Sequence, residues 1–244
     1  MTTIVSAFIS NINFRANRDL NKYCEFGKLI FKSKTPKVIF LDEIMYNLIK
    51  EEDYDASNSV IIKFEKDDLF LNEYADLITN FDINTTSKEK DTVQYMFTQC
   101  NKTDWVRKAI ELNPFYTDNF MWIDFGIKHM NHCSDEEFIQ KLNNLNNKQY
   151  SNVRISSLWN LQVRYIFDIY KDVIWYFAGS IFGGHKDALL VFHKKMEEKC
   201  LEIIKTKNTI MWEINIWYLI YSENKDLFDA YKSTGHNDTV IDNY

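Results

Sequence analysis

Short runs of apolar, β-branched residues alternate along the chain with segments whose apolar residues recur every three or four positions. The first run, TIVSAFI at residues 3–9, is apolar without interruption, as in a strand covered on both faces. Residues 20–31 follow with helical spacing, and KVIFLDE at 37–43 has the pattern of a second strand that ends in two carboxylates. This alternation predicts a parallel sheet with covering helices.

The same rhythm continues through the rest of the chain. Further strands are expected at 59–65, 120–124 and 152–159, where apolar or alternating runs occur. Helical patterns are expected at 67–80, 87–101, 101–112, from the capping box at 134, and at 186–205. The sequence therefore predicts a single α/β domain over residues 1–244, with a mostly parallel central sheet flanked by helices.

Composition favours a globular protein and argues against a dedicated nucleic-acid binder. The 244 residues are 45% hydrophobic and 26% charged, which suits a globular protein with a continuous core. The net charge of −6 gives no basic field for a phosphate backbone, so a dedicated nucleic-acid binder is not expected. Aromatic residues make up 16% of the chain, which leaves rings available to line a pocket.

Cysteine spacing and hydropathy bear on the compartment. The four cysteines are far apart, form no C-x-x-C pair and follow no secretory leader, which predicts reduced thiols and a cytoplasmic protein. No run approaches the length of about 18 apolar residues that a transmembrane helix needs. We therefore expect no transmembrane segment.

Two segments stand out as places for ligand binding. Asp124 in WIDFG closes an apolar run, and an Asp at a strand end can hold a divalent cation against a diphosphate, although it could equally cap the next turn. Residues 173–184 pass from a β-rich run into a cluster with three of the six glycines. That cluster predicts a sharp turn or the close approach of another group. It matches neither a dinucleotide fingerprint nor a P-loop.

Carboxylate and histidine candidates follow later in the chain. Glu213 lies in MWEINIW, where it faces either solvent or a pocket, and desolvation in a pocket would raise its pKa toward values useful for a base. Asn215 beside it would help to orient a substrate. His129, His132 and Cys133 are close in sequence, but a surface loop is the favoured interpretation. His236 could fold back onto a metal.

These segments occur in the order expected of the WlaTC/HtrL glycosyltransferases, a family that the chain resembles over nearly its whole length. WIDFGI and the FAG-FGG segment are the specific parts. The resemblance implies a divergent GT-A fold that binds a nucleotide-sugar, with UDP as the expected nucleotide, at the sheet edge. It implies transfer of the sugar to a glycan or glycoprotein acceptor. The segments are TIVSAFI, KVIFLDE, Lys102 with DWVRKAI, WIDFGI, WYFAGSIFGG and WEINIWY.

The resemblance also implies roles for individual residues. Glu213 would be the catalytic base or support the donor sugar. If Glu213 were not the base, Asp42 and Glu43 at the end of the second predicted strand would be the next carboxylates to examine. Asp124 would stand in the metal-binding D-x-D position and hold Mn²⁺ or Mg²⁺. Because Gly126 replaces the second Asp, His236 would complete the metal site, carried by a flexible lid that begins at about Tyr231. The implied donor-binding residues are Ser6, Ala7, Phe8, Ile9, Arg15, Lys102, Trp122, Asp124, Gly126, Ala178, Gly179 and Asn215.

Two alternatives remain open at this point. Loss of the second acidic ligand at Gly126 is also compatible with a catalytically inactive GT-A-like protein that binds a nucleotide or a glycan. A nucleotide-binding interaction module of unrelated fold would require that WIDFGI be only a strand end.

Overall fold

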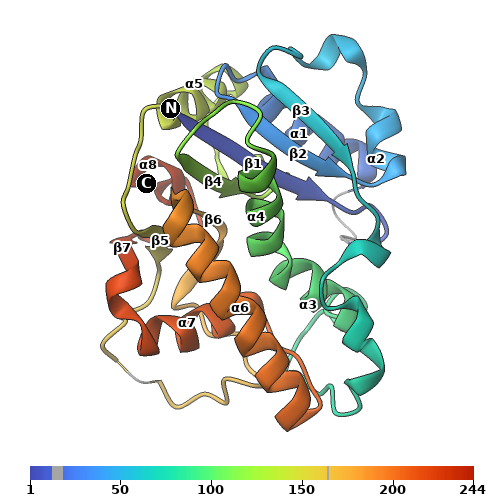
Figure 1. Cartoon of the computed structure of the whole chain (residues 1–244), viewed down its shortest axis with the longest axis vertical. Helices are drawn as coiled ribbons and strands as arrows, with labels where there is room; N and C mark the ends of the chain where they lie inside the picture. Colours follow the sequence, from blue (N-terminus) through green and yellow to red (C-terminus); the bar gives the residue numbers. More distant parts are fainter. Residues whose placement is uncertain (13–18, 164) are drawn as a thin grey trace.

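The structure is a computed structural model that describes residues 1–12, 19–163 and 165–244. Within these ranges one seven-stranded sheet forms the centre of the molecule, in the order β3-β2-β1-β4-β6-β5-β7 (Figure 1). The β1–β2, β2–β3, β1–β4 and β5–β7 pairs are parallel, whereas β6 runs antiparallel to β4 and β5. The strands are β1 (Thr2–Phe8), β2 (Lys37–Leu41), β3 (Ser59–Lys63), β4 (Asn119–Ile123), β5 (Val153–Ser157), β6 (Phe177–His185) and β7 (Phe228–Lys232).

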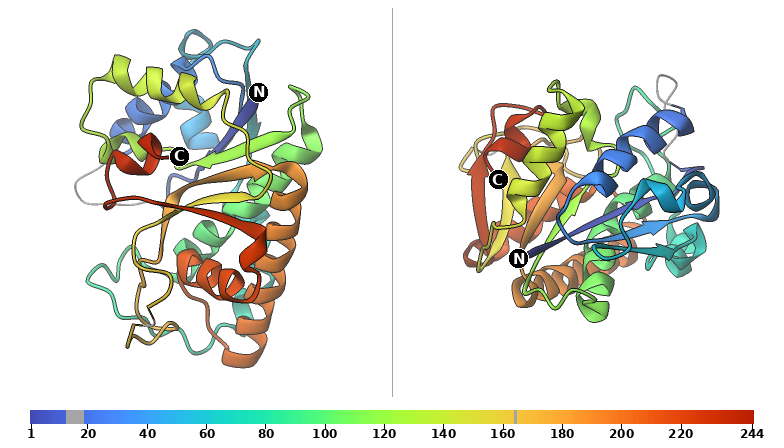
Figure 2. Two further views of the ribbon diagram at one scale, coloured as in Figure 1. Left: turned by 90° about the vertical axis from the view of Figure 1, so that its left-hand side faces the viewer. Right: turned by 90° about the horizontal axis from the view of Figure 1, so that it is seen from above.

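Helices cover both faces of this sheet, as the view from above in Figure 2 shows. One face carries α3 (Val93–Cys100), α4 (Lys102–Leu112), α6 (Lys186–Lys207) and α7 (Glu213–Glu223). The other carries α1 (Leu20–Lys32), α2 (Glu43–Leu48), α5 (Asp135–Leu145) and α8 (Thr239–Asp242). Short 3-10 segments lie at Glu51–Asp53, Lys66–Asp68, Asn72–Leu77, Ile127–Met130 and Lys225–Leu227. The predicted α/β fold with a mostly parallel, helix-flanked sheet is confirmed.

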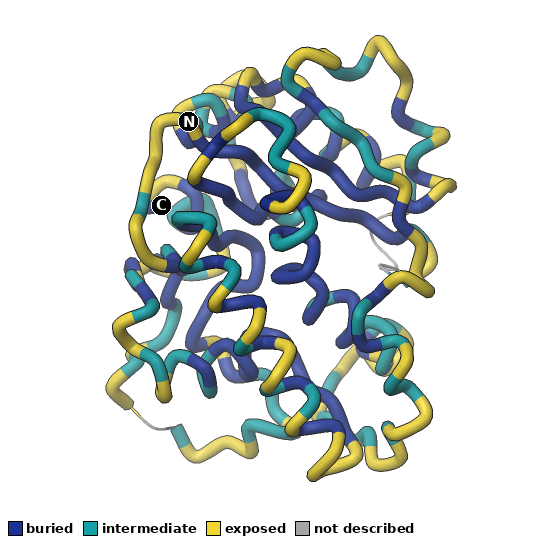
Figure 3. Tube along the Cα trace, viewed as in Figure 1, coloured by how far each residue is buried: buried dark blue, intermediate teal, exposed yellow. Residues whose placement is uncertain are grey.

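Successive side chains of the central strands point to opposite sides of the sheet. Because helices cover both sides, these strands are buried on both faces. On β1, Val5 packs into the core under α4 and α6, whereas Ile4 packs into the core under α1 and α5. β4 does the same with Trp122 and Met121. Figure 3 shows these strands buried along their length, with exposed residues in the connections and on the outer faces of the helices. Double-sided burial explains the uninterrupted apolar runs in the sequence.

Several predicted elements differ from the observed ones. The expected helix at 67–80 is two 3-10 segments, the one at 87–101 begins only at Val93, and the strand at 37–43 ends at Leu41. The expected sharp turn in the glycine cluster is wrong, because β6 runs straight through it. The other expectation, the close approach of another group to these glycines, is correct. A Cβ at Gly183 would lie 2.6 Å from the carbonyl oxygen of Phe120, and Gly184 has a φ of +149°.

The C-terminal part of the chain is packed against the sheet. Tyr231 belongs to β7, which pairs with β5, and its hydroxyl donates a hydrogen bond to the carbonyl oxygen of Val240. Tyr244 is only 3% exposed. Tyr231 and Tyr244 are therefore both anchored, so the prediction that a flexible lid begins at about Tyr231 is wrong. His236 lies between these two residues, in the connection from β7 to α8. None of the helices in the described ranges is long and apolar enough to cross a membrane.

Candidate functional site

The candidate site lies at the carboxyl ends of β1 and β4. The chain proceeds from β1 to β2 and β3 on one side, and then returns to form β4 on the other side of β1. In α/β sheets a crevice opens where the strand order switches in this way, and ligands bind there. β6 extends this edge, because the amide of Asp124, just after β4, donates a hydrogen bond of 2.9 Å to the carbonyl oxygen of Ser180.

Two adjoining cavities occupy this edge. The smaller, about 90 Å³, is here named the aromatic cavity after the rings of Phe8, Tyr23, Trp105, Trp122 and Phe125 that line it. The larger, about 520 Å³, is named the main cavity, and its walls include Trp175, Gly179, Trp212, Glu213 and His236. Both cavities share the residues Lys90, Tyr95, Gln99, Lys102, Asp124 and His129. The shared residues make the two cavities one continuous candidate site.

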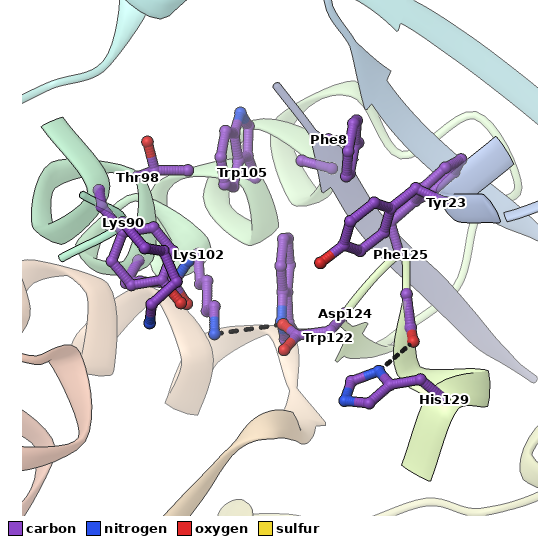
Figure 4. Close-up of a pocket in the computed structure, with 14 residues that line it drawn as sticks. Phe8, Tyr23, Lys90, Thr98, Lys102, Trp105, Trp122, Asp124, Phe125 and His129 are labelled. Carbon is purple, nitrogen blue, oxygen red and sulfur yellow. Dashed lines mark hydrogen bonds and ion pairs between the residues drawn. The ribbon is translucent and has the colours of Figure 1, made fainter. Parts of the chain in front are cut away.

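Lys102, the first residue of α4, joins the two carboxylates of the site. Its Nζ donates hydrogen bonds of 2.9 Å to Oε1 of Glu213 and 2.9 Å to the carbonyl oxygen of Gly179, and lies 3.2 Å from Oδ1 of Asp124. Figure 4 shows the ammonium pointing at Asp124 beside the ring of Trp122. Burial alone would lower the pKa of Lys102, but the charges of Asp124 and Glu213 outweigh burial and raise it above its usual value. The ammonium therefore stays protonated.

Three features of the packed structure hold this group in place. Glu213 is the first residue of α7, where the helix dipole favours a negative charge. At Gly179 on β6, a Cβ would lie 2.3 Å from Oε1 of Glu213. Glycine at this position therefore leaves room for the Lys102–Glu213 ion pair against the strand. Asp124 is held by Trp122, whose Nε1 donates to Oδ1 at 2.8 Å, and Trp122 stacks on Trp105 with the rings 8° apart in orientation.

Two histidines flank the main cavity. His129 Nδ1 lies 2.6 Å from the carbonyl oxygen of Gly126, which places the proton on Nδ1. His236 packs its ring edge-on against Trp175, with centroids 4.8 Å apart, and its Nδ1 lies 3.2 Å from Sδ of Met130. Burial lowers the pKa of His236 below its usual value, and the nearby Asp124 only partly offsets this. Burial therefore favours the neutral form of His236.

A comparison with protein families places the chain among known sequences. A family described as "Bacterial protein of unknown function (HtrL_YibB)" matches residues 30–239. The chain belongs to the HtrL_YibB family. The match spans the segment that carries Lys102, Asp124, Glu213 and His236. It supports the HtrL part of the resemblance seen in the sequence. A comparison with curated protein sequences found no match.

Solved structures offer distant similarities to this family member. The structure of 4-diphosphocytidyl-2C-methyl-D-erythritol synthase from Anaerococcus prevotii aligns with a TM-score of 0.44 and 11% identity, covering 97% of this chain and 88% of that one. Mouse xyloside xylosyltransferase 1, in its apo form, aligns with a TM-score of 0.45 and 11% identity, covering 95% of this chain and 85% of that one. Neither similarity is close enough to indicate a function.

The structure brings most of the predicted site residues to the two cavities. These are Ala7, Phe8, Lys102, Trp122, Asp124, Gly126, Gly179, Glu213 and His236. Packing explains why residue 126 is a glycine, because a Cβ there would lie 2.7 Å from the ring of Tyr23. Arg15, predicted near the diphosphate, lies outside the described residues.

Other predicted donor contacts are placed elsewhere. Asn215 accepts a hydrogen bond from the amide of Ile174 and donates to the carbonyl oxygens of Ile169 and Asp172, so its amide holds a loop rather than a substrate. Ser6, Ile9 and Ala178 are buried and line neither cavity. The two cavities therefore give no support to these predicted contacts, which stay predictions.

Asp42 and Glu43, the other carboxylates considered as a base, also lie outside the site. Asp42 accepts hydrogen bonds from the amides of Met45 and Ser10, and so caps α2. Glu43 is exposed and pairs with Lys63. Neither lines one of the two cavities.

Sequence reasoning missed several lining residues. Tyr23, Lys90, Tyr95, Gln99 and Trp175 line one or both cavities. Trp175 begins the WYFAGSIFGG segment but was not singled out in it, and no motif marks the other four, because they come from segments that meet only in the folded chain. The surplus of aromatic residues was the one available signal, and it did not say which rings were involved.

The side chains present do not fit a resident divalent cation. Oδ1 of Asp124 already faces the ammonium of Lys102 and the indole N–H of Trp122. His236, the expected second ligand, has Nδ1 against Met130. Within the described ranges no group of three or more His, Cys, Asp and Glu side chains could hold a metal ion. The predicted Mn²⁺ or Mg²⁺ requirement is taken up again below.

Proposed function

We propose that this protein is a glycosyltransferase that moves a sugar from a nucleotide-sugar, with UDP as the expected nucleotide, to a hydroxyl group of a glycan or glycoprotein. The observation that carries the proposal is the position of Glu213. Its side chain is only 6% exposed, it lines the main cavity, and its Oε1 is held by Lys102. A carboxylate fixed by one oxygen at a ligand crevice is well placed to accept a proton with the other.

The chemistry of transfer needs such a group. The acceptor oxygen forms a bond to the anomeric carbon, the bond from that carbon to the diphosphate breaks, and the hydroxyl proton passes to the Glu213 carboxylate. Among the described residues, Oε2 of Glu213 makes no hydrogen bond, which leaves it for the acceptor. The nucleoside diphosphate departs with the bonding electron pair.

The adjoining aromatic cavity supports a nucleotide donor. Its lining is largely aromatic, which suits contact with an apolar group such as a base or one face of a sugar. Lys90, whose ammonium pairs with Asp91 and lies over the ring of Tyr95, also lines both cavities. A donor whose base lies in the aromatic cavity would thus extend its sugar toward Glu213 in the main cavity.

One observation favours a second candidate, an inactive protein that binds nucleotide or glycan. Lys102 contacts both Asp124 and Glu213, so the charges of the two carboxylates are already partly compensated. A site of this kind could bind a sugar without activating a hydroxyl. The two candidates differ in one measurable property, which is turnover of the donor.

The test compares donor breakdown by the wild type and by Glu213→Gln. The protein is incubated with a panel of UDP-sugars, and UDP release is followed by chromatography. Glu213→Gln keeps the acceptor for Lys102 but loses the base, so turnover should fall about 10²-fold or more while UDP affinity by calorimetry changes little. Glu43→Gln is the matched control, because Glu43 also begins a helix but is exposed. UDP binding without turnover of any donor would favour the inactive candidate, and equal turnover by the wild type and Glu213→Gln would remove Glu213 as the base.

A further inference from the structure

The ammonium of Lys102 occupies a cradle of three oxygens that come from three different elements. Glu213 on α7 and the carbonyl of Gly179 on β6 each lie 2.9 Å from Nζ, and Asp124 after β4 lies 3.2 Å from it. An ammonium has three N–H donors, so each can face one of these oxygens. Carboxylate and carbonyl oxygens are also the ligands that Mg²⁺ and related cations take. The cradle is thus a cation site whose occupant is a side chain.

The cost of this arrangement indicates more than a surface ion pair. The side chains of Lys102 and Glu213 are 4% and 6% exposed, and burying two charges is unfavourable unless they pair closely. Lys102 also begins α4, where the helix dipole disfavours a positive charge. Asp124, by contrast, is 34% exposed and opens to both cavities. The buried Lys102–Glu213 pair therefore also contacts the carboxylate of Asp124, which a ligand can reach.

We propose that Lys102 supplies from within the chain one of the two positive charges that a divalent cation would bring, and that this is enough for the protein to bind and turn over its nucleotide-sugar without a metal ion. The inference rests on the proposed function. Two carboxylates alone would give the cradle a charge of −2 and repel a diphosphate. The ammonium reduces that charge to −1, which weakens the repulsion by about half, and it holds Asp124 and Glu213 in place. Lys102 acts here as a positioning residue, through the carboxylates that line the cavities.

The proposal makes a prediction that needs no enzyme activity. In Lys102→Met the ammonium is removed while the length of the side chain is nearly kept, so the three oxygens are left without a cation. We expect this variant to acquire a Mn²⁺ site at least about tenfold tighter than any in the wild type, because two uncompensated carboxylates attract a divalent ion. Mn²⁺ binding is measured by the loss of the free-ion signal in electron paramagnetic resonance, without nucleotide.

Lys37→Met is the matched control for loss of a buried lysine. Lys37 is fully buried, but its Nζ donates to the carbonyl oxygen of Ser33 and to Oδ1 of Asn58, both neutral groups. This variant should gain no Mn²⁺ site. The double variant Lys102→Met/Glu213→Gln should lose most of the Mn²⁺ affinity that Lys102→Met gains. No gain of Mn²⁺ binding in a folded Lys102→Met variant would overturn the proposal.

A second measurement uses the wild type alone and applies even where Lys102→Met fails to fold. UDP affinity is determined by calorimetry in EDTA and in saturating Mn²⁺, and we expect the two values to agree within about twofold. Tenfold tighter UDP binding in Mn²⁺ would overturn the proposal. Failure of the proposed function is distinguishable, since it would show as no UDP binding under either condition while the Mn²⁺ result for Lys102→Met still stands.

Discussion

Lys37 and Lys102 are both almost fully buried, and their neighbours give them opposite acid–base behaviour. The Lys37 ammonium donates its hydrogen bonds to neutral oxygens, and burial, only partly offset by the charge of Asp55, lowers its pKa from 10.5 to about 8. Lys102 faces two carboxylates, which more than offset the effect of burial. The same residue type therefore serves a structural purpose at the start of β2 and an electrostatic one at the candidate site.

The lowered pKa of Lys37 predicts a dependence of stability on pH. Between about pH 8 and 10.5 the unfolded chain binds more protons than the folded one, so the free energy of unfolding rises with pH across this window. Lys37→Met removes this titration. The difference in unfolding free energy, wild type minus variant, should therefore increase by up to about 3 kcal/mol between pH 7.5 and 10.5, as measured by urea denaturation. A difference that does not change with pH would show that Lys37 is solvated in the folded protein.

At the scale of elements, β6 shows why glycine is needed at particular places in a strand. Gly179 leaves room for Glu213, and Gly183 leaves room for the hydroxyl of Tyr244, which lies 2.2 Å from where a Cβ would be. Both neighbours are more than 30 residues away in sequence. The close approaches therefore depend on how α7 and the C-terminal residues pack on the sheet, and not on the local chain.

The glycine at 179 carries a prediction about the site. In Gly179→Ala the new Cβ would meet Oε1 of Glu213 at 2.3 Å and Cγ2 of Ile214 at 3.2 Å, so α7 or the carboxylate must move. We expect a loss of about 1–3 kcal/mol in stability, typical of overpacking, together with reduced donor turnover. Gly235→Ala is the control, because its nearest neighbour would be 3.4 Å away. Thermal melting and UDP release check both variants, and equal behaviour of the two would mean that Glu213 adapts without cost.

These contacts also mark the limit of what the sequence could predict. β1, β4 and α6 were predicted to within about two residues, because burial on two faces or on one helical stripe leaves a periodic pattern in the chain. Asp124 was identified because it ends such a strand. The bridge that Lys102 forms from Asp124 to Glu213 has no periodic signature, since it depends on α4, β6 and α7 meeting at one point. The role of Asn215 in holding a loop was missed for the same reason.

At the scale of the whole molecule, the C-terminal residues connect the sheet to the site. Tyr244 packs edge-on against Tyr150 and Tyr231, with centroids 5.3 and 5.8 Å apart. Its partner Tyr231 lies on β7, and the connection that follows carries His236 into the wall of the main cavity. The position of His236 therefore depends on contacts made behind the sheet edge, away from the cavity itself.

This dependence predicts that a substitution remote from the cavity changes the titration of His236. In Tyr244→Ala the buried ring is lost, and we expect a decrease of about 3–5 kcal/mol in stability, as for other large buried aromatic residues. The loosened α8 should let water reach His236, whose pKa is lowered by burial in the wild type, so this pKa should rise toward its ordinary value near 6.5. The imidazole resonances of His236, followed by NMR as a function of pH, report the change directly. Tyr116→Ala is the control, because Tyr116 is 92% exposed and should affect neither quantity. If the pKa of His236 stayed lowered in a folded but destabilised Tyr244→Ala variant, the cavity wall itself, through Trp175 and Met130, would be what holds the histidine in place.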